Sequence, residues 1–538
     1  MTLILNKHSS LIVLALTFWL ITFNSVISQS YLYFNNRYDI NEQGLKDDCY
    51  SIIASDDGFV IASSSLVISE NIYWWELKLS ELDQTGIIQS IKTFGKDSVD
   101  YFFTNSGCII NNNEMYYAVA KLRTPSVNGS LDESVIMLLN EELDTIWMRR
   151  YGEKSVPYDT SYLFTALQKI NQGKIIISGS WKPYGLPTHA YLVETDSSGI
   201  MIWQKSYETG FYTEAYSVSQ TSDEGFILGC IRYAPGNSYL HDPVIIKTDS
   251  LGNEEWIKNL GGDFMDNKAM VCMSKDSMIV IGTNYADSMD SPYVAFSKIN
   301  IIKIDNDGNI IWNEKYGASR PANYLLNIRI LNDNSIIAVG TLRKDNPEPE
   351  WVGWILKTDA NGDSLWYREY FNLTGQESRN YLYDVIPTSD NGLIACGYVD
   401  PYPPDTGSTD TWVIKLDSIG CDSAGCDTTV GIKDDDKTGR LYDVDKSNLD
   451  IWPNPASGIV DCRLPIVDLR GDWTLMIYDI FGREVLAPYT PSPAMGEGRG
   501  GGWQGWRLDV SALPPGVYFV SVLVDGKRVA GGKFVVSR

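Results

Sequence analysis

A sequence unit of about 55 residues recurs along most of the chain and limits what this protein can fold into. Each copy holds an apolar strand, an Asp-x-x-Gly turn and a short strand, usually with a Trp near its start. The residues at this Trp position are Phe34, Ser90, Trp147, Trp203, Trp256, Trp312 and Trp366. Such a period predicts a fold built from repeated copies of one structural unit.

A second element alternates with the first and adds two more strands to each unit. It consists of two apolar strands around a tight turn, with the clearest copies at Gly58, Gly225 and Gly392. Asp-Gly and Asn-Gly pairs between apolar runs favour hairpins, so each unit holds two hairpins. Seven four-stranded units predict an all-β fold with a seven-bladed β-propeller, against six or eight blades or a β-solenoid.

The two ends of the repeat complement each other. The last unit, Trp412 to Gly420, has its turn but no Trp strand after it, whereas the strand at Phe34 precedes any complete unit. We therefore expect the N-terminal strand to pair with the last blade and close the ring. One Trp per unit predicts packing within or between blades rather than ligand binding. The Asp residues of turns such as Asp305-Asn-Asp-Gly308 predict turn capping rather than calcium binding, because the downstream Glu is missing.

The N-terminus differs from the repeat. Lys7 and His8 precede an apolar run from Leu11 to Phe23, which predicts a signal peptide over residues 1–28. A membrane anchor is the alternative, although this run is short for a span.

The composition changes again after the repeat. The propeller is predicted over residues 29–426, and a polar linker follows over residues 427–448. Residues 449–538 form about seven short apolar strands, which predict a small β-sandwich.

Charge and cysteine content narrow the choice of partners. Lys and Arg number 44 against 68 Asp and Glu, and a net charge of −24 argues against nucleic acid and anionic membranes. Cys421 and Cys426 flank a turn-rich stretch, which predicts a disulfide. A metal site there would need two further ligands, and we expect no metal and no cofactor. The other six Cys are scattered singly along strands, which predicts small buried side chains.

Several motifs occur in a fixed order near the C-terminus. They are Pro453-Asn454-Pro455, the Gly482 turn after Tyr478-Asp-Ile-Phe, Gly516-Val-Tyr518, and the ending from Lys533 to Arg538. Together they resemble the type A C-terminal sorting domain of the type IX secretion system. The resemblance implies export through the periplasm and outer membrane, a secreted or cell-surface location, and the secretion machinery as a partner. An accessory sandwich that binds the propeller's own ligand is the alternative.

The repeat also predicts where recognition would occur. The tight Asp-Gly turns all lie on one face of a propeller, so the longer connections and their aromatic residues gather on the other. The candidate ligand-binding residues are Trp181, Tyr184, His189, Tyr233, Tyr239, His241, Trp351 and Tyr402. The alternative is that these aromatic side chains only cover the bases of loops.

No His-Glu-x-x-His or Gly-x-Ser-x-Gly motif is present, and no catalytic residue is predicted. We therefore expect a recognition or adhesion protein for an extracellular glycan or protein. An exported polysaccharide hydrolase or lyase that uses the same face is the alternative.

Overall fold

The computed structural model is almost entirely β-structure. The residues that it describes are 33–95, 99–112, 115–126, 129–155, 158–183, 185–234, 237–291, 294–344, 350–374, 377–402, 407–423, 450–464, 473–479, 485, 489–491, 504–524 and 527–537. The chain divides into two compact units, Met1–Asp434 and Asp435–Arg538. Within the described ranges, the helical structure is one turn of 3-10 helix, η1 (Asn171–Gly173). None of the described segments is a helix long and apolar enough to cross a bilayer.

The described part of the first unit holds seven antiparallel sheets, which we number along the chain. Sheet 1 contains β2 (Asp47–Ala54), β3 (Gly58–Ser69), β4 (Ile72–Asp83) and β5 (Ile88–Phe94). Sheet 2 contains β6 (Asp100–Phe102), β7 (Ile109–Asn111), β8 (Tyr116–Ser126), β9 (Gly129–Leu139) and β10 (Thr145–Tyr151). Sheet 3 contains β11 (Glu153–Ser155), β12 (Tyr158–Lys169), β13 (Ile175–Lys182), β14 (His189–Thr195) and β15 (Met201–Tyr207).

The other four sheets follow the same order. Sheet 4 contains β16 (Tyr212–Gln220), β17 (Phe226–Ala234), β18 (Asn237–Thr248) and β19 (Glu254–Asn259). Sheet 5 contains β20 (Met270–Met273), β21 (Ile279–Ser291), β22 (Val294–Ile304) and β23 (Ile310–Pro321). Sheet 6 contains β24 (Tyr324–Ile330), β25 (Ile336–Lys344), β26 (Glu350–Thr358) and β27 (Ser364–Tyr370). Sheet 7 contains β28 (Arg379–Pro387), β29 (Leu393–Asp400), β30 (Asp410–Leu416) and the N-terminal strand β1 (Phe34–Tyr38).

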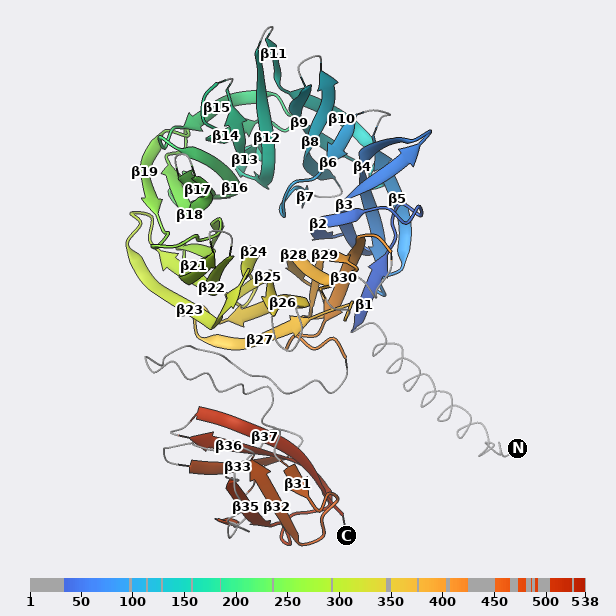
Figure 1. Cartoon of the computed structure of the whole chain (residues 1–538), viewed down its shortest axis with the longest axis vertical. Coiled ribbons are helices and arrows are strands. Elements are labelled where there is room, and N and C mark those ends of the chain that lie inside the picture. Colours follow the sequence, from blue (N-terminus) through green and yellow to red (C-terminus); the bar gives the residue numbers. More distant parts are fainter. Residues whose placement is uncertain are drawn as a thin grey trace, which may run out of the picture. The chain divides into compact units, whose positions relative to one another are not determined.

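The sheets form a ring whose ends meet in sheet 7 (Figure 1). Strand β1 pairs antiparallel with β30, which places Phe34 opposite Lys415. The continuous sheets use the same register, since Trp312 lies opposite Lys303 and Trp366 lies opposite Lys357. The N-terminal strand therefore takes the place of the strand that the last repeat lacks.

The third strands of sheets 3 and 7 are covered on both sides by neighbouring sheets. Every residue of β14 and β30 is buried, which explains why these strands are near-continuous apolar runs. The first strands instead alternate between buried and half-buried positions, as β16 does.

The Lys of the repeat pairs with the Asp of the first turn of its own sheet. Lys247 Nζ lies 2.8 Å from Asp223, and Lys303 Nζ lies 2.7 Å from Asp276. Lys357 pairs with Asp333, and Lys415 with Asp390, in sheets 6 and 7. Sheet 3 reverses the charges, because Glu194 occupies the third-strand position and accepts from Lys174 at 2.8 Å.

A repeated contact, which we call the aromatic lock, joins several of the outer strands to the next sheet. The Trp203 ring packs on Gly252, and the Tyr207 hydroxyl donates to the Gly252 carbonyl at 2.9 Å. In the same way, the Trp366 ring packs on Gly420, and the Tyr370 hydroxyl donates to the Gly420 carbonyl at 2.6 Å. These glycines have positive φ, and a Cβ there would lie under 3 Å from the ring. The Trp side chains therefore pack between sheets, as predicted.

The N-terminal strand makes the same lock with sheet 1. Phe34 packs on Gly86, and the Tyr38 hydroxyl donates to the Gly86 carbonyl at 2.6 Å. Burial raises the pKa of Tyr38 to about 12, so this hydroxyl keeps its proton.

Between sheets 1 and 2 the lock is inverted. The outer strand carries the small Ser90 at the Trp position, and the turn that faces it carries Leu143 where the other turns have Gly. Leu143 has a φ of 60° and is fully buried in a core cluster against which the half-buried Phe94 also packs. A large residue in the turn thus fills the space that the small strand residue leaves.

A buried carboxylate ties sheet 7 to both of its neighbours. Asp384 on β28 accepts from Arg329 Nη2 at 2.8 Å and from Asn327 at 2.7 Å, both in sheet 6. Its other oxygen accepts from Ser51 of sheet 1 at 2.8 Å.

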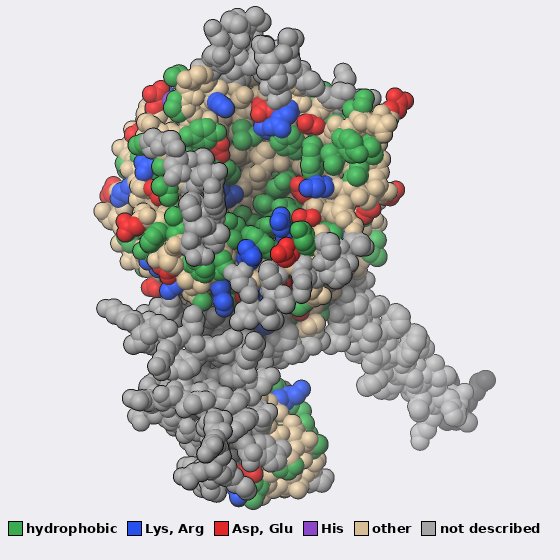
Figure 2. All heavy atoms as spheres, viewed as in Figure 1, with side chains coloured by type: hydrophobic (Ala, Val, Ile, Leu, Met, Phe, Trp, Pro, Cys, Tyr) green, Lys and Arg blue, Asp and Glu red, His purple; other side chains and the backbone are tan. Residues whose placement is uncertain are grey.

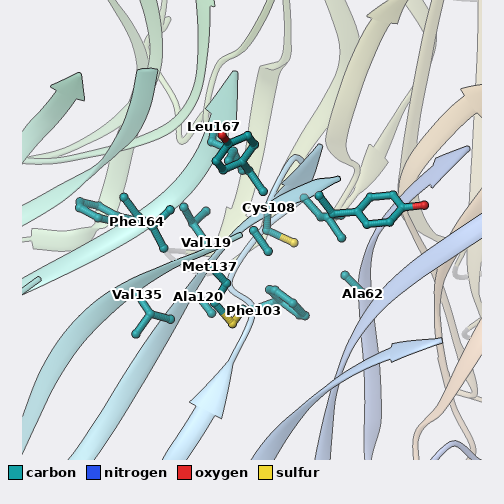
Figure 3. Packing of buried hydrophobic residues seen from close by; sticks show 14 of the residues in the cluster. Ala62, Phe103, Cys108, Val119, Ala120, Val135, Met137, Phe164 and Leu167 are labelled. Carbon is teal, nitrogen blue, oxygen red and sulfur yellow. The ribbon is translucent and has the colours of Figure 1, made fainter. Parts of the chain in front are cut away.

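Two sheets depart from the predicted four strands. Sheet 3 gains the short β11, and the inner strand of sheet 2 is divided into β6 and β7, which both pair with β8. The residues between β6 and β7, which we call the axial segment (residues 103–108), turn towards neighbouring sheets. Asn105 donates to the Tyr216 carbonyl of sheet 4, and Ser106 to the Leu326 carbonyl of sheet 6. Figure 3 shows Phe103 and Cys108 of this segment among buried residues of sheets 1, 2 and 3.

The second unit has two sheets around one core. The first contains β31 (Asp450–Trp452), β32 (Ile459–Leu464), β34 (Tyr489–Pro491) and β35 (Gln504–Asp509). The second contains β33 (Trp473–Asp479), β36 (Gly516–Val524) and β37 (Lys527–Val536). Alternate residues of both sheets, including Val460, Leu508, Val520 and Phe534, bury a core of their own.

Candidate ligand-binding face

The sheet topology separates two faces of the ring. The turns between first and second strands, and between third and fourth strands, lie on one face, which we call the tight-turn face. The remaining connections lie on the long-loop face. Asp305 of the tight-turn face accepts from the backbone and side-chain amides of Asn309 at 2.8 and 2.9 Å. These hydrogen bonds lower the pKa of Asp305, and they confirm its role in the turn.

Six aromatic rings form a continuous group near the starts of the inner strands on the long-loop face, which we call the aromatic cluster. Its members are Tyr50, Tyr324, Trp351, Tyr381, Tyr383 and Tyr398, and all six are half-buried. Trp351 stacks on Tyr324 with centroids 6.3 Å apart, and it meets Tyr381 at 5.6 Å. Tyr383 lies edge-on to Tyr50 at 5.1 Å. The cluster therefore joins sheets 6, 7 and 1.

The pleat of sheet 7 places three of these rings together. Tyr381 and Tyr383 alternate on β28 and so share one side, and Tyr398 is the cross-strand partner of Tyr381. The Tyr381–Tyr398 centroids lie 5.0 Å apart.

On the face that Figure 2 shows, hydrophobic side chains surround a shallow hollow at the centre of the ring, with a few charged side chains between them.

A carboxyl group adjoins the cluster. Burial, together with the nearby Asp400 and Asp47, raises the pKa of Asp48 to about 7 against the opposing effect of Lys46. The Tyr50 hydroxyl is hydrogen-bonded to Asp48, and burial raises the pKa of Tyr50 well above its ordinary value. A carboxyl group with a pKa near 7 holds a proton that it can give up, which is the property of a general acid.

A second polar group lies where the axial segment meets sheet 4. Lys268 donates to Asn105 at 2.8 Å, and its ammonium lies 4.4 Å from the centroid of the Tyr216 ring. The Tyr216 hydroxyl donates to Glu214 at 2.7 Å. Burial lowers the pKa of Lys268 to about 7, while Glu214 acts in the opposite direction.

The two predicted histidines have different surroundings. His189 is buried, 8% exposed, with its ring centroid 5.7 Å from that of Trp181. His241 contacts Tyr233 at 5.5 Å and bonds the Asp266 carbonyl through Nδ1. Burial lowers the pKa of His241. His241 also lines a small cavity of about 20 Å³, near the volume that one water molecule requires.

The remaining predicted residues are not gathered in one place. Trp351 is the one that lies in the aromatic cluster, and Tyr233 packs on Tyr212 in sheet 4 at 5.3 Å. Tyr402 is 47% exposed after β29. Tyr184 and the side chain of Tyr239 lie outside the described residues.

The five tyrosines of the aromatic cluster were not predicted from sequence. For four of them the signal is the recurrence of Tyr in first strands, above all the Tyr381-x-Tyr383 alternation, whereas Tyr398 lies on the second strand β29.

One group of three carboxylates lies near the N-terminal strand. Within the described ranges, the ligand atoms of Asp39, Asp47 and Asp410 lie within 4.8 Å of one another. Arg37 pairs with Asp410, and Asp47 accepts from the backbone amide of Ile40 at 2.9 Å. Arg37 offsets one of the three charges, and the group joins the N-terminal segment to sheet 7.

The cysteines follow two patterns. Cys49, Cys108, Cys230, Cys396 and Cys462 are free and buried, as predicted, whereas the free Cys272 is half-buried. Cys421 is disulfide-bonded. Cys426, its predicted partner, lies outside the described residues, so this pairing stays a prediction.

The motif residues of the second unit fix its terminal strand. The Asn454 side chain donates to the Lys533 carbonyl at 3.1 Å and accepts from the Val535 amide at 2.9 Å. Tyr518 stacks on Phe534 at 5.7 Å and donates to the Pro514 carbonyl at 2.8 Å. Pro453 and Pro455 are exposed beside Asn454, Gly516 is half-buried at the start of β36, and Gly482 lies outside the described residues.

Residues 450–537 match the family of secretion system C-terminal sorting domains. The second unit is therefore a type IX sorting domain, and the chain is exported to the cell surface or the extracellular space. No curated protein matches the chain.

Among solved structures, the chain is similar to a puromycin hydrolase at 10% identity and a TM-score of 0.34, over 67% of this chain and 58% of that one. It is also similar to an α-L-arabinanase of Penicillium chrysogenum complexed with arabinobiose, at 12% identity and a TM-score of 0.36. This match covers 56% of this chain and 90% of that one. A third similar structure is the WD40 domain of SCAP from fission yeast, at 6% identity and a TM-score of 0.32. This match covers 72% of this chain and 91% of that one.

Proposed function

We propose that the first unit is a seven-bladed β-propeller that binds an extracellular glycan through its aromatic cluster, as a recognition or adhesion module. The cluster is the observation that carries this proposal. Six half-buried rings from three consecutive sheets form a rigid apolar platform, and five of them carry a hydroxyl group. The hydroxyl of Tyr50 is held by Asp48, and those of Tyr383 and Tyr398 are held by each other. Sugar rings have apolar C–H faces and polar edges, which match such a surface.

The rigidity of the platform supports binding at low entropic cost. Tyr and Trp have few rotatable bonds, and each cluster ring is held by at least one neighbouring ring. Loop aromatic residues that only covered strand ends would not need to stack across three sheets.

Glycan arrays followed by calorimetry test this proposal on the full chain. We expect W351A and Y381A to weaken binding of the best glycan at least tenfold. The matched control is Y73A, because Tyr73 lies at the end of the β3–β4 hairpin and is 59% exposed without belonging to the cluster. Equal binding by W351A, Y381A and Y73A would contradict the proposal.

A second candidate is a polysaccharide hydrolase or lyase on the same face. Asp48 favours it, because its raised pKa and its neighbour Asp400 place an acid and a second carboxyl group beside the cluster. Reducing-end assays on the glycans that bind distinguish the two functions. Turnover that D48N abolishes, with binding retained, would establish the enzyme.

We also propose that residues 449–538 are a removable export address, preceded by a linker over residues 427–448 and, at the N-terminus, a signal peptide over residues 1–28. The separate core of the second unit supports this division. Removing residues 449–538 should leave a folded first unit in the periplasm of a host with the secretion system. A truncated chain that still reaches the surface would exclude this role.

A further inference from the structure

Two buried thiols lie in the core where sheet 1 packs on sheet 7. Cys49 lies on β2 and Cys396 on β29, and both side chains are fully buried. They belong to the same hydrophobic cluster, and the nearby Cys49 thiol adds to the effect of burial in raising the pKa of Cys396. Both thiols are free in the structure. The two residues are therefore far apart in sequence but share one buried cluster in the ring.

We propose that Cys49 and Cys396 form a disulfide in the exported protein, which links the first sheet covalently to the last. Strand β2 packs against β29, and the two thiols lie in the buried cluster that these strands share, which places each thiol in reach of the other. The sorting domain sends the chain to compartments where disulfides persist, and Cys421 already forms one.

The position of the pair gives the bond a function. The ring closes by hydrogen bonds between β1 and β30, since β1 does not continue from the strand it pairs with. Cys49 follows β1 in the chain and Cys396 precedes β30. A bond between them would hold the ring together even when β1 separates from β30.

Other uses of these thiols fit less well. Cys108 also lies near Cys49 and Asp384, but a Cys49–Cys108 bond would join sheets 1 and 2, which are already consecutive. A soft metal ion would need three or more ligands. In the described part of the chain, the group of three that meets this spacing is the carboxylates Asp39, Asp47 and Asp410.

The reaction requires a disulfide-containing oxidant, such as a dithiol oxidase or oxidised glutathione. One cysteine loses its proton and attacks the disulfide of the oxidant, which forms a mixed disulfide and releases one oxidant thiol. The second cysteine thiolate then displaces the other oxidant sulfur. The protein loses two electrons and two protons, and the oxidant becomes two thiols. Burial raises the pKa of Cys396 well above its ordinary value, so we expect the reaction before the ring closes.

Peptide mapping of the exported full chain tests the proposal. The protein is denatured and alkylated without reduction, digested, and analysed by mass spectrometry. We expect one linked pair that contains Cys49 and Cys396 and lacks two hydrogen atoms relative to the free peptides. Full alkylation of both cysteines, or a link from either one to Cys108, would overturn the proposal.

Thermal unfolding provides a second readout. Reductant should lower the unfolding temperature of the wild type and of C230A, a control that removes a buried free thiol from sheet 4. In the C49A/C396A double variant, reductant should have a clearly smaller effect, because only the Cys421 disulfide remains to be reduced. An equal shift in all three proteins would contradict the proposal, and a double variant that does not fold leaves the peptide map to decide.

Discussion

Sheet 7 and sheet 6 have the same ladder, register and aromatic lock, but their outer strands are attached differently. In sheet 6, β27 follows β26 through the turn that ends at Gly362, whereas in sheet 7 β1 arrives from the other end of the chain. Phe34 nevertheless faces Lys415 as Trp366 faces Lys357. Side-chain packing is therefore sufficient to set the register, and the connecting turn is not required for it.

Removing β1 should have the largest effect on this arrangement. We expect deletion of residues 31–38 to lower the free energy of unfolding of the first unit by about 5 kcal/mol or more, which is comparable to the stability of a whole domain. The reason is the loss of one ladder and of the Phe34–Gly86 lock. Urea unfolding measures the change. A synthetic peptide of residues 31–38 should restore stability, and unchanged cooperative unfolding without it would show that β1 does not close the ring.

Substituting Asp384 should have the next largest effect. D384N keeps the shape but leaves Arg329 without its charged partner, so we expect a loss of about 3 kcal/mol in unfolding free energy. D333N is the control, because Asp333 is an exposed turn residue, its partner Lys357 lies 3.3 Å away and is partly exposed, and the loss should cost less. Equal costs in denaturant titrations would show that the ties around Asp384 are not special to sheet 7.

The pH dependence of stability should distinguish the contact between sheets 1 and 7 from the turns. The pKa of Asp48 is raised to about 7, so the folded state holds a proton that the unfolded state loses near pH 4. Stability from this group is present below about pH 4 and is lost as the pH rises through about 7. D48N should flatten this decrease by about 2 kcal/mol in unfolding experiments between pH 4 and 8.

For Asp390, the pH dependence of stability has the opposite sign. Burial opposes the effect, but hydrogen bonds from Lys415 and Thr388 lower its pKa overall. Its stabilising contribution is therefore lost as the pH falls through the lowered pKa, and D390N should reduce acid sensitivity instead. If D48N and D390N changed the pH profile of stability in the same direction, the opposite signs assigned to Asp48 and Asp390 would be contradicted.

The smallest effect should come from the lock glycines. G86A tests the lock of β1 and G420A tests the lock of β27, and in both a Cβ would lie under 3 Å from an aromatic ring. We expect each to cost about 2 kcal/mol, against about 1 kcal/mol for G210A, which has a similar positive φ but open space around it. Thermal unfolding measures the three. A much smaller cost for G86A than for G420A would show that the β1 lock is the weaker one.

The sequence predicted the repeating parts of this architecture better than the site. The Trp positions marked outer strands, and the unpaired strand at Phe34 predicted its pairing with the last repeat, because both signals recur at a fixed period. The residues of the aromatic cluster do not recur at a fixed period along the sequence. Tyr50 and Tyr383 are adjacent in space only because the ring closes, and Tyr381 and Tyr398 meet only through strand register. The two histidines were grouped by their equivalent positions, but each has its own ring partner.

The inverted lock of Ser90 and Leu143 affects how such a ring can be rebuilt. Each lock is shared, with one half on an outer strand and the other on the following turn, so neighbouring sheets must be matched to each other. A copy of sheet 2 inserted elsewhere would present Leu143 to a Trp, and two large side chains would compete for one space. Sheet 3 carries both matching halves, Gly199 in its turn and Trp203 on its outer strand. In a ring lengthened by copying sheet 3, Trp203 of one copy would therefore pack on Gly199 of the next. Chimeras of this protein should therefore exchange segments cut within a sheet, so that each lock is transferred whole.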